Sequence, residues 1–153
     1  MGFPRRGERL TDSLPDAEFG FPRTDLRRRL VEAILRGEKT STTALLSDYE
    51  RSDDPLPKLG ERFRLIDERD QVVGIIETTE VRVSTIGEVD LRFAIEEGEG
   101  FTSVEEWRVA HEEFWMSYAD ETRAWLGDPE WRPNDDTKIV CERFRLVEAV
   151  PGL

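Results

Sequence analysis

The segment 62–83 places the strongest constraint on the fold. Apolar and polar residues alternate over 62–67, a turn-forming run follows at 68–71, and a long return strand is predicted over 72–83. In the return strand Val73 and Ile75 face one way, while Val72 and Ile76 face the other. Apolar residues on both faces predict a sheet covered on both sides, or the wall of a small barrel.

The remaining elements do not alternate strictly between strand and helix. A third strand is predicted over 138–149, with a slip in its alternation between Cys141 and Phe144 that suits a β-bulge. Helical spacing of apolar residues and N-capping residues predicts helices over 24–36, 88–96, 103–117 and 120–126. We therefore expect an α+β fold, a small β-barrel or curled mixed sheet with two to four surrounding helices, rather than a doubly wound parallel sheet.

Charge and length narrow the functional classes. The chain has 153 residues and a net charge of −12, from 22 Lys and Arg against 34 Asp and Glu. We expect one domain over 19–153, preceded by a proline-containing lead-in over 1–18. Duplex DNA binding needs many cations on phosphates, so we expect none, whereas a small cleft for one nucleotide or single strand stays open.

The single cysteine and the absence of a long apolar run favour a reducing compartment away from the membrane. Cys141 has no partner for an internal disulfide, which fits a reducing environment, and no stretch approaches 18 apolar residues. We expect a cytoplasmic protein with no membrane contact, and the oligomeric state stays open. Because His111 is the only histidine, we expect no zinc site, no other metal and no cofactor.

The run 37–43 is the first candidate for chemistry. Lys39 follows a predicted helix C-cap at Gly37, and a partly desolvated lysine could act as a base with Thr42 as its nucleophile. Spacing alone favours the alternative, a solvated lysine beside residues that make turn hydrogen bonds. So polar a run after a helix is not expected in the core.

The second candidate is the glycine-rich acidic run 96–100, whose glycines would let the backbone approach a ligand closely. The alternative is an acidic loop that precedes a helix, where the helix dipole favours negative charge. The basic stretch 23–39 and the acidic stretch 96–121 could face each other across a cleft. We expect His111 and Cys141 to be structural, since both lie in apolar patterns.

Taken together, several segments resemble the ASCH domain family (activating signal cointegrator homology), stand-alone bacterial type. The resemblance covers about residues 19–148 and rests on these segments: 19–20, 37–43, 49–50, 55–60, 76–81, 97–100 with Ser103, Trp107 and His111, and 140–144. It implies a PUA-like fold, a small β-barrel with helices around a cleft, and an association with RNA.

Some bacterial members of that family remove an acyl group from the exocyclic amine of cytidine, and others are ribonucleases. Carried over by motif, the resemblance implies Lys39 as base, Thr42 as nucleophile and Glu99 as acid, with Glu97 as the alternative acid. Substrate contacts are expected from neighbouring positions: Gly37, Thr40, Ser41, Glu97, Gly98, Gly100 and Arg143.

The leading hypothesis is therefore an amidohydrolase acting on an acylated, cytidine-like nucleoside. The alternatives are a non-catalytic module that binds RNA or a nucleotide, and a metal-independent ribonuclease. In each case the expected partner is RNA or a modified nucleoside in a small cleft.

Overall fold

The sheet at the centre of the molecule joins the three strands predicted from the sequence. The computed structural model describes residues 13–150, and within them five strands run in the order β1-β3-β4-β5-β2. Their bounds are β1 Asp16–Ala17, β2 Ser41–Leu45, β3 Arg62–Ile66, β4 Val72–Thr85 and β5 Lys138–Ala149. β1 is parallel to β3 and every other pair is antiparallel, so the prediction that 62–67, 72–83 and 138–148 share one curved sheet is confirmed.

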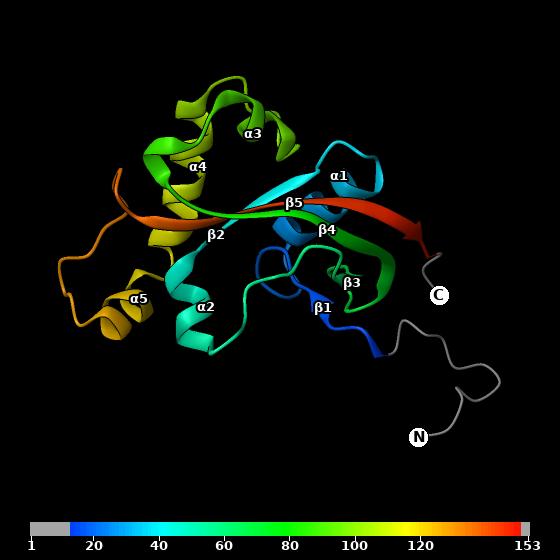
Figure 1. Cartoon of the computed structure of the whole chain (residues 1–153), viewed down its shortest axis with the longest axis horizontal. Helices are drawn as coiled ribbons and strands as arrows, with labels where there is room; N and C mark the ends of the chain where they lie inside the picture. The colour runs from blue at the N-terminus through cyan, green and yellow to red at the C-terminus, as the bar shows by residue number, and fades with distance from the viewer. Residues whose placement is uncertain (1–12, 151–153) are drawn as a thin grey trace.

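The sheet curls because its two longest strands are irregular. β4 and β5 pair from Gly74 to Thr85, and the register shifts twice along the way. One shift inserts Thr79 of β4 opposite the junction of Arg143 and Phe144, which is where the alternation of β5 slips in the sequence. The result is a half-barrel of mixed sheet, an α+β fold, with β4 and β5 crossing its centre (Figure 1).

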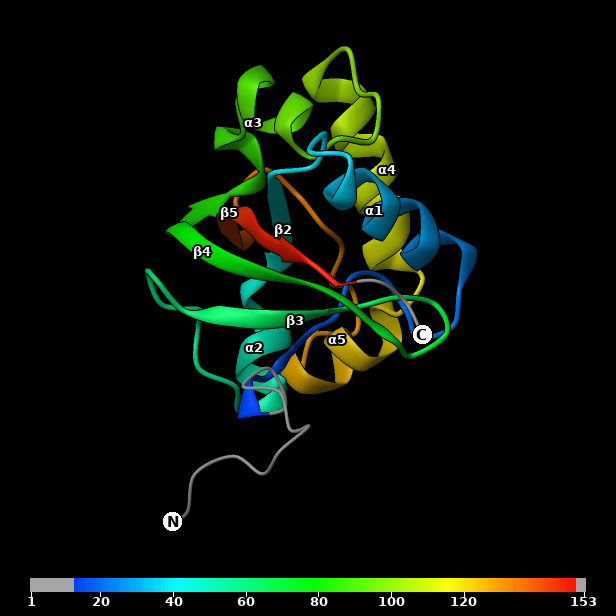
Figure 2. The same cartoon turned by 90° about the vertical axis from the view of Figure 1, so that its right-hand side faces the viewer.

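Five α-helices surround the sheet in the described region. They are α1 Asp25–Leu35, α2 Leu46–Ser52, α3 Leu91–Glu96, α4 Val104–Met116 and α5 Ala119–Leu126, with a short 3₁₀ helix at Ile86–Glu88. The capping residues explain two helix starts, because the Thr24 and Ser103 hydroxyls accept hydrogen bonds from the third residue beyond each. Both α1 and α4 lie on the right-hand side of the sheet in Figure 2.

Two separate apolar clusters form the core. One packs α3 and α4 against β2 and β5, with Trp107 and Trp115 fully buried. The other packs α1 against β3, β4 and β5 around Phe19 and Phe144, whose ring centroids are 5.7 Å apart. Phe19 of the second cluster and Trp115 of the first both reach the wall of a pocket.

The main departure from the sequence analysis is the polar run after α1, which was not expected in the core. Residues 41–45 form β2, and Lys39, Ser41 and Leu45 are all buried. The Ser41 hydroxyl donates to the Phe93 carbonyl oxygen, so its burial leaves no unpaired polar group. The expectation failed because polar side chains can be buried when a distant element supplies their hydrogen-bond partners.

The lead-in expected over 1–18 is described only in part. Residues 1–12 lie outside the described residues. Asp16–Ala17 adds a short parallel strand to β3, and the Arg64 side chain donates to the Asp16 carboxylate at 2.7 Å.

Candidate functional site

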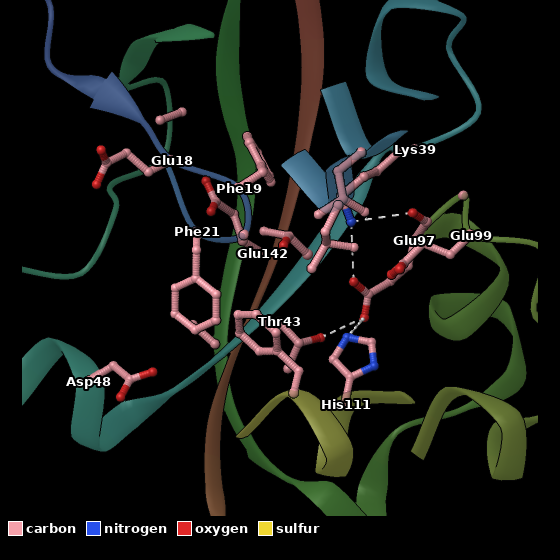
Figure 3. Close-up of a pocket in the computed structure, with 18 of the residues that line it drawn as sticks. Glu18, Phe19, Phe21, Lys39, Thr43, Asp48, Glu97, Glu99, His111 and Glu142 are labelled. Atoms are coloured by element: carbon pink, nitrogen blue, oxygen red, sulfur yellow. Dashed lines mark hydrogen bonds and ion pairs between the residues drawn. The ribbon is translucent and has the colours of Figure 1, made fainter. Parts of the chain in front are cut away.

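A deep pocket of about 1560 Å³ opens between α1, β2, α2, α4 and the loop 97–100. Its lining includes Lys39, Thr42, Glu97 and Glu99, which the sequence analysis had placed in one site, and Figure 3 shows three of them at its wall. Lys39 and Glu97, 58 residues apart in the sequence, thus meet at this pocket. The basic stretch 23–39 and the acidic stretch 96–121 were expected to face each other across a cleft.

Lys39 lies in the short segment between α1 and β2, where its backbone NH donates to the Ala33 carbonyl at 3.1 Å. Its side chain is buried, with Nζ at 2.8 Å from the Ser41 carbonyl oxygen and 3.2 Å from both the carbonyl oxygen and Oε1 of Glu97. The three hydrogens of an ammonium group therefore have three acceptors. The same Nζ lies 5.8 Å from the centroid of the Phe19 ring, at the edge of one core cluster.

Glu97 caps the C-terminal end of α3 and turns its carboxylate into the protein. Oε1 pairs with Lys39, and Oε2 accepts from the Thr43 hydroxyl at 2.9 Å and from the Trp107 indole NH, with His111 Nε2 at 3.0 Å. Burial by itself would raise the pKa of Glu97. The charges of His111 and Lys39 and the hydrogen bonds from His111 and Trp107 outweigh burial and lower this pKa to about 2.

The loop after Glu97 can approach Lys39 because it contains glycine. Gly98 has φ +72°, and a Cβ atom there would lie 2.6 Å from the backbone N and Cα of Lys39. Glu99 follows on the pocket wall. Its side chain stays accessible to solvent, but the surrounding protein partly excludes water, and this burial raises its pKa, reinforced by the charge of Glu97 and opposed by Lys39.

The two threonines that line the pocket belong to opposite faces of β2, since side chains alternate along a strand. Thr43 donates to Glu97. The Thr42 hydroxyl has no side-chain hydrogen bond to any residue of the described segment 13–150, which leaves it available to a ligand.

His111, expected from the sequence to be structural, and Trp107 both contact the Glu97 carboxylate. They are one turn apart on α4, and their rings stack with centroids 4.4 Å apart. Their i, i+4 spacing was visible in the sequence, but nothing there indicated that a carboxylate would lie opposite them.

The opposite wall carries a second buried carboxyl group that the sequence analysis did not identify. Glu142 of β5 accepts a hydrogen bond from the Thr78 hydroxyl at 2.7 Å, and burial raises its pKa. Tyr49 of α2 lines the same wall, and burial raises the pKa of its phenol above the ordinary value, helped by the charge of Glu142. The only signal in the sequence was a glutamate within an apolar strand.

Four of the predicted substrate contacts do not line the pocket: Gly37, Thr40, Ser41 and Arg143. Arg143 instead pairs with Glu96 of α3 at 2.8 Å and with Glu80 of β4. Gly98 and Gly100 do line the pocket, as predicted. Ser41 does not, because its hydroxyl turns into the core and donates to the Phe93 carbonyl oxygen.

The pocket is acidic. Twelve aspartates and glutamates line it, against one histidine, His111, and four Lys and Arg residues, Arg29, Arg36, Lys39 and Arg51. Each of these four Lys and Arg residues is paired with a carboxylate: Lys39 with Glu97, Arg51 with Asp48, Arg36 with Glu38 and Arg29 with Asp25. Such a lining repels polyanions and favours neutral or cationic ligands.

One group of side chains has the composition of a metal site. The ligand atoms of Glu97, Glu99 and His111 lie within 4.8 Å of one another. The Glu97 carboxylate already meets the Lys39 ammonium group, the Trp107 and Thr43 donors, and His111. The positions that a cation would take around this carboxylate are therefore held by protein donors, and we read the group as a salt-bridge cluster.

The fold and the pocket define a PUA-like α+β domain, and comparison with known proteins identifies its family. The family model of the ASCH domain matches residues 18–148, so the chain belongs to the ASCH domain family, which is PUA-like and associated with RNA in general.

Solved structures agree with this assignment. The crystal structure of protein EF3133 from Enterococcus faecalis V583 is 27% identical with a TM-score of 0.72, covering 86% of this chain and 74% of that one. The ASCH domain from Lactobacillus crispatus JV V101 is 29% identical with a TM-score of 0.67, covering 78% and 71%. A mutant form of the ASCH protein from Zymomonas mobilis shares the fold at 16% identity and a TM-score of 0.51, covering 82% and 67%.

Among curated proteins, none matches the chain. Within residues 13–150, the helices are too short or too polar to cross a membrane.

Proposed function

We propose that the protein binds a nucleoside in this pocket and hydrolyses an acyl amide on the exocyclic amine of its base. The observation that carries the proposal is the buried Lys39–Glu97 pair at the wall of an acidic pocket. Thr42 lines the same pocket, and its hydroxyl has no side-chain partner among residues 13–150. A buried charged pair is costly to maintain for stability alone, which supports a role at a ligand site.

The acidic lining supports a nucleoside over a polynucleotide. A ribonuclease or an RNA-binding cleft must attract several phosphates, and that attraction comes from Lys and Arg. Here the acidic side chains outnumber Lys and Arg three to one. A nucleoside without phosphates meets no such repulsion.

Aromatic side chains at the pocket provide a surface for a planar base. Phe21 stacks on Phe114 with ring centroids 4.9 Å apart, and the Tyr118 ring lies edge-on to both. All three line the pocket, and Phe21 is exposed. Stacking on such rings tolerates any base, so it favours a nucleobase without choosing among them.

In the proposed reaction the Thr42 oxygen attacks the acyl carbon and Lys39 takes the threonine proton. The carbon–nitrogen bond breaks, and Glu99 gives its proton to the departing amine. Water then attacks the acyl-threonine ester and gives a proton to Glu99, Lys39 returns its proton to the departing threonine oxygen, and the carboxylic acid is released. The raised pKa of Glu99 suits an acid, whereas Glu97, with a pKa of about 2, is the counter-ion that holds Lys39.

A second candidate function, a non-catalytic nucleoside-binding module, is favoured by the state of Lys39. Its Nζ has three acceptors within 3.2 Å, the arrangement of a protonated amine. To act as a base, Lys39 must react as a neutral amine, which leaves one of these acceptors without a hydrogen. A binding module needs no such change.

The deciding experiment incubates the purified protein with N4-acetylcytidine and measures the release of cytidine and acetate by chromatography. Thr42→Ala and Glu99→Gln are the sharpest variants, because neither removes a partner of the buried pair. We expect Thr42→Ala to lower kcat at least a hundredfold and Glu99→Gln about a hundredfold, the usual scale for acid–base groups. Thr40→Ala is the matched control, since Thr40 does not line the pocket, and it retains wild-type turnover.

The alternatives give different results in the same preparation. Saturable binding of cytidine without hydrolysis supports the binding module. Salt-dependent binding or cleavage of single-stranded RNA contradicts both candidates. A cytoplasmic location, expected from the single cysteine, stays a prediction.

A further inference from the structure

His111 occupies an unusual hydrogen-bonding position. Its Nδ1 atom lies 2.8 Å from the Trp107 carbonyl oxygen, and its Nε2 atom lies 3.0 Å from Oε2 of Glu97 (Figure 3 shows the ring against this carboxylate). A carbonyl oxygen is only an acceptor, and so is an ionised carboxylate. Both ring nitrogens of His111 therefore face acceptors.

A neutral imidazole cannot satisfy this arrangement. It carries one hydrogen, so whichever nitrogen lacked it would point a lone pair at an oxygen lone pair. The remaining possibility, a proton on Glu97, conflicts with the donors that already face both oxygens of that carboxylate: the Lys39 ammonium group on Oε1, and the Thr43 hydroxyl and Trp107 indole NH on Oε2. The geometry is satisfied when His111 is an imidazolium with a hydrogen on each nitrogen.

The surroundings of His111 support the charged form. The titratable groups that face it are Glu97 and Glu99 from the loop after α3, and Lys39 reaches the same Glu97 carboxylate from the segment before β2. Its other neighbours are the rings of Trp107, Trp115 and Phe101. Burial by itself would lower the pKa of His111, but the charge of Glu97 and the hydrogen bonds to Glu97 and Trp107 raise it overall.

Glu97 connects His111 to the rest of the site. The carboxylate is bonded on one oxygen to Lys39 and on the other to α4 and Thr43, so it joins two sides of the pocket. The next residue, Gly98, runs directly against the Lys39 backbone, and Glu99 follows. A displacement of Glu97 therefore moves Glu99 and at the same time removes the ion pair that holds Lys39.

We propose that His111 is a positioning residue of this site: as an imidazolium it holds Glu97 between α4 and Lys39 and so fixes Glu99, and its deprotonation releases the loop 97–100. Once the ring is neutral, one of its two contacts becomes a repulsion between lone pairs. The site is then assembled below the pKa of His111 and loosened above it. The role in turnover rests on the proposed function, whereas the charge state of His111 does not.

The charge state can be measured directly because His111 is the only histidine in the chain. Long-range ¹H–¹⁵N correlation spectra of the labelled, tag-free protein report both imidazole nitrogens across pH 5–9. We expect both to be protonated at pH 6.5, with a titration midpoint above the ordinary 6.5 of histidine. In Glu97→Gln the midpoint falls by at least one pH unit. In Glu96→Gln, the neighbouring control, it stays within a few tenths of a pH unit of the wild-type value.

A neutral ring at pH 6.5, or a midpoint that is unchanged in Glu97→Gln, would overturn the proposal. Should Glu97→Gln fail to fold, the wild-type titration alone decides the charge state.

The positioning role is tested by kcat against pH for N4-acetylcytidine. Wild-type kcat is expected to fall on the alkaline side with the midpoint seen by NMR. His111→Gln, whose amide can donate to Glu97 at every pH, keeps kcat within about threefold at pH 7 and loses that alkaline limb. His111→Leu, which donates nothing, lowers kcat at least tenfold with little change in KM.

An alkaline limb that persists in His111→Gln, or full activity in His111→Leu, contradicts a role through Glu97. If the wild type hydrolyses nothing, the proposed function fails while the NMR midpoint still decides the charge of His111. The pH dependence of cytidine binding in the same three proteins then tests the positioning role.

Discussion

Glu96 and Glu97 are adjacent in the chain, yet they lie in opposite electrostatic environments. Glu96 pairs with Arg143 and Arg92 near the surface, where its side chain is 22% exposed. Glu97 pairs with Lys39 and His111 where its side chain is 1% exposed. The last residue of α3 thus contributes to a surface network, while the capping residue after it contributes to a buried cluster.

The comparison shows that burial, rather than the number of ion pairs, decides what a carboxylate does. Water screens the Glu96 pairs and competes with them, so they add little to stability. Around Glu97 the protein itself supplies every donor, and loss of one partner leaves an uncompensated charge in the interior. The buried carboxylate also lies between the two core clusters, because Lys39 approaches Phe19 and Glu97 contacts Trp107.

The largest difference in stability is expected when the Glu96 and Glu97 carboxylates are each replaced by an amide. Glu97→Gln leaves Lys39 and His111 without their counter-ion, and we expect the free energy of unfolding to fall by about 3–5 kcal/mol, as when buried pairs lose one partner. Glu96→Gln is expected to cost less than about 1 kcal/mol. Urea denaturation of the two variants measures both, and equal losses would contradict the distinction.

Stability should depend on pH on both sides of an optimum because of the buried cluster. The folded pKa of Glu97 is lowered to about 2, so its contribution of about 3 kcal/mol is present above pH 4.5 and lost as pH falls toward 2. The folded pKa of His111 is raised, so its contribution is present below pH 6.5 and lost as pH rises through the folded value.

Denaturation at fixed pH values is expected to show maximal stability between about pH 4.5 and 6.5. His111→Gln should flatten the alkaline side alone. A wild-type curve that keeps rising between pH 6.5 and 8 would be the contrary result.

The backbone of the loop after Glu97 shows the same contrast between a buried and an open position, at Gly98 and Gly100. Gly98 and Gly100 both have left-handed φ angles, +72° and +84°, so an alanine at either position is strained by about 1–2 kcal/mol. At Gly98 the new Cβ would also lie 2.6 Å from the Lys39 backbone, whereas at Gly100 it meets nothing within 4 Å. We expect Gly98→Ala to cost about 1–3 kcal/mol more than Gly100→Ala in thermal or urea unfolding.

The smallest effect is expected at Arg143. Arg143→Ala removes the surface pairs with Glu96 and Glu80, at a cost of about 1 kcal/mol or less. Because Arg143 does not line the pocket, cytidine binding measured by calorimetry should be unchanged. A tenfold loss of affinity would restore it as a substrate contact, as the sequence analysis assigned it.

Local sequence patterns determined the elements whose signals are local. The helix α1 was predicted from its apolar spacing and the Thr24 cap, and the β3–β4 hairpin from the alternation on either side of its turn. α4 followed from Ser103 and the apolar residues that repeat along it. In each of these the pattern and the final burial agree, since an apolar face turns toward a core.

β2 lacked such a signal, and so it was missed. Its residues are mostly polar, and the hydroxyls of Ser41, which is buried, and Thr43, which is half-buried, find acceptors only at Phe93 and Glu97, more than 50 residues away. Likewise, Lys39 and the run 96–100 were singled out by residue type, but the choice between Glu97 and Glu99 as the partner of Lys39 depends on how α3 ends.

Local patterns in the chain therefore predict the hairpin, the principal helices, the acidic character of the protein and the two runs that could carry chemistry. The tertiary structure alone decided that β2 joins β5, that Glu97 rather than Glu99 meets Lys39, and that His111 and Trp107 complete the cluster. The physical reason is that apolar periodicity reports on contacts within an element. The charge, hydrogen bonding and burial of a side chain are set by partners that only the folded chain brings within a few ångströms.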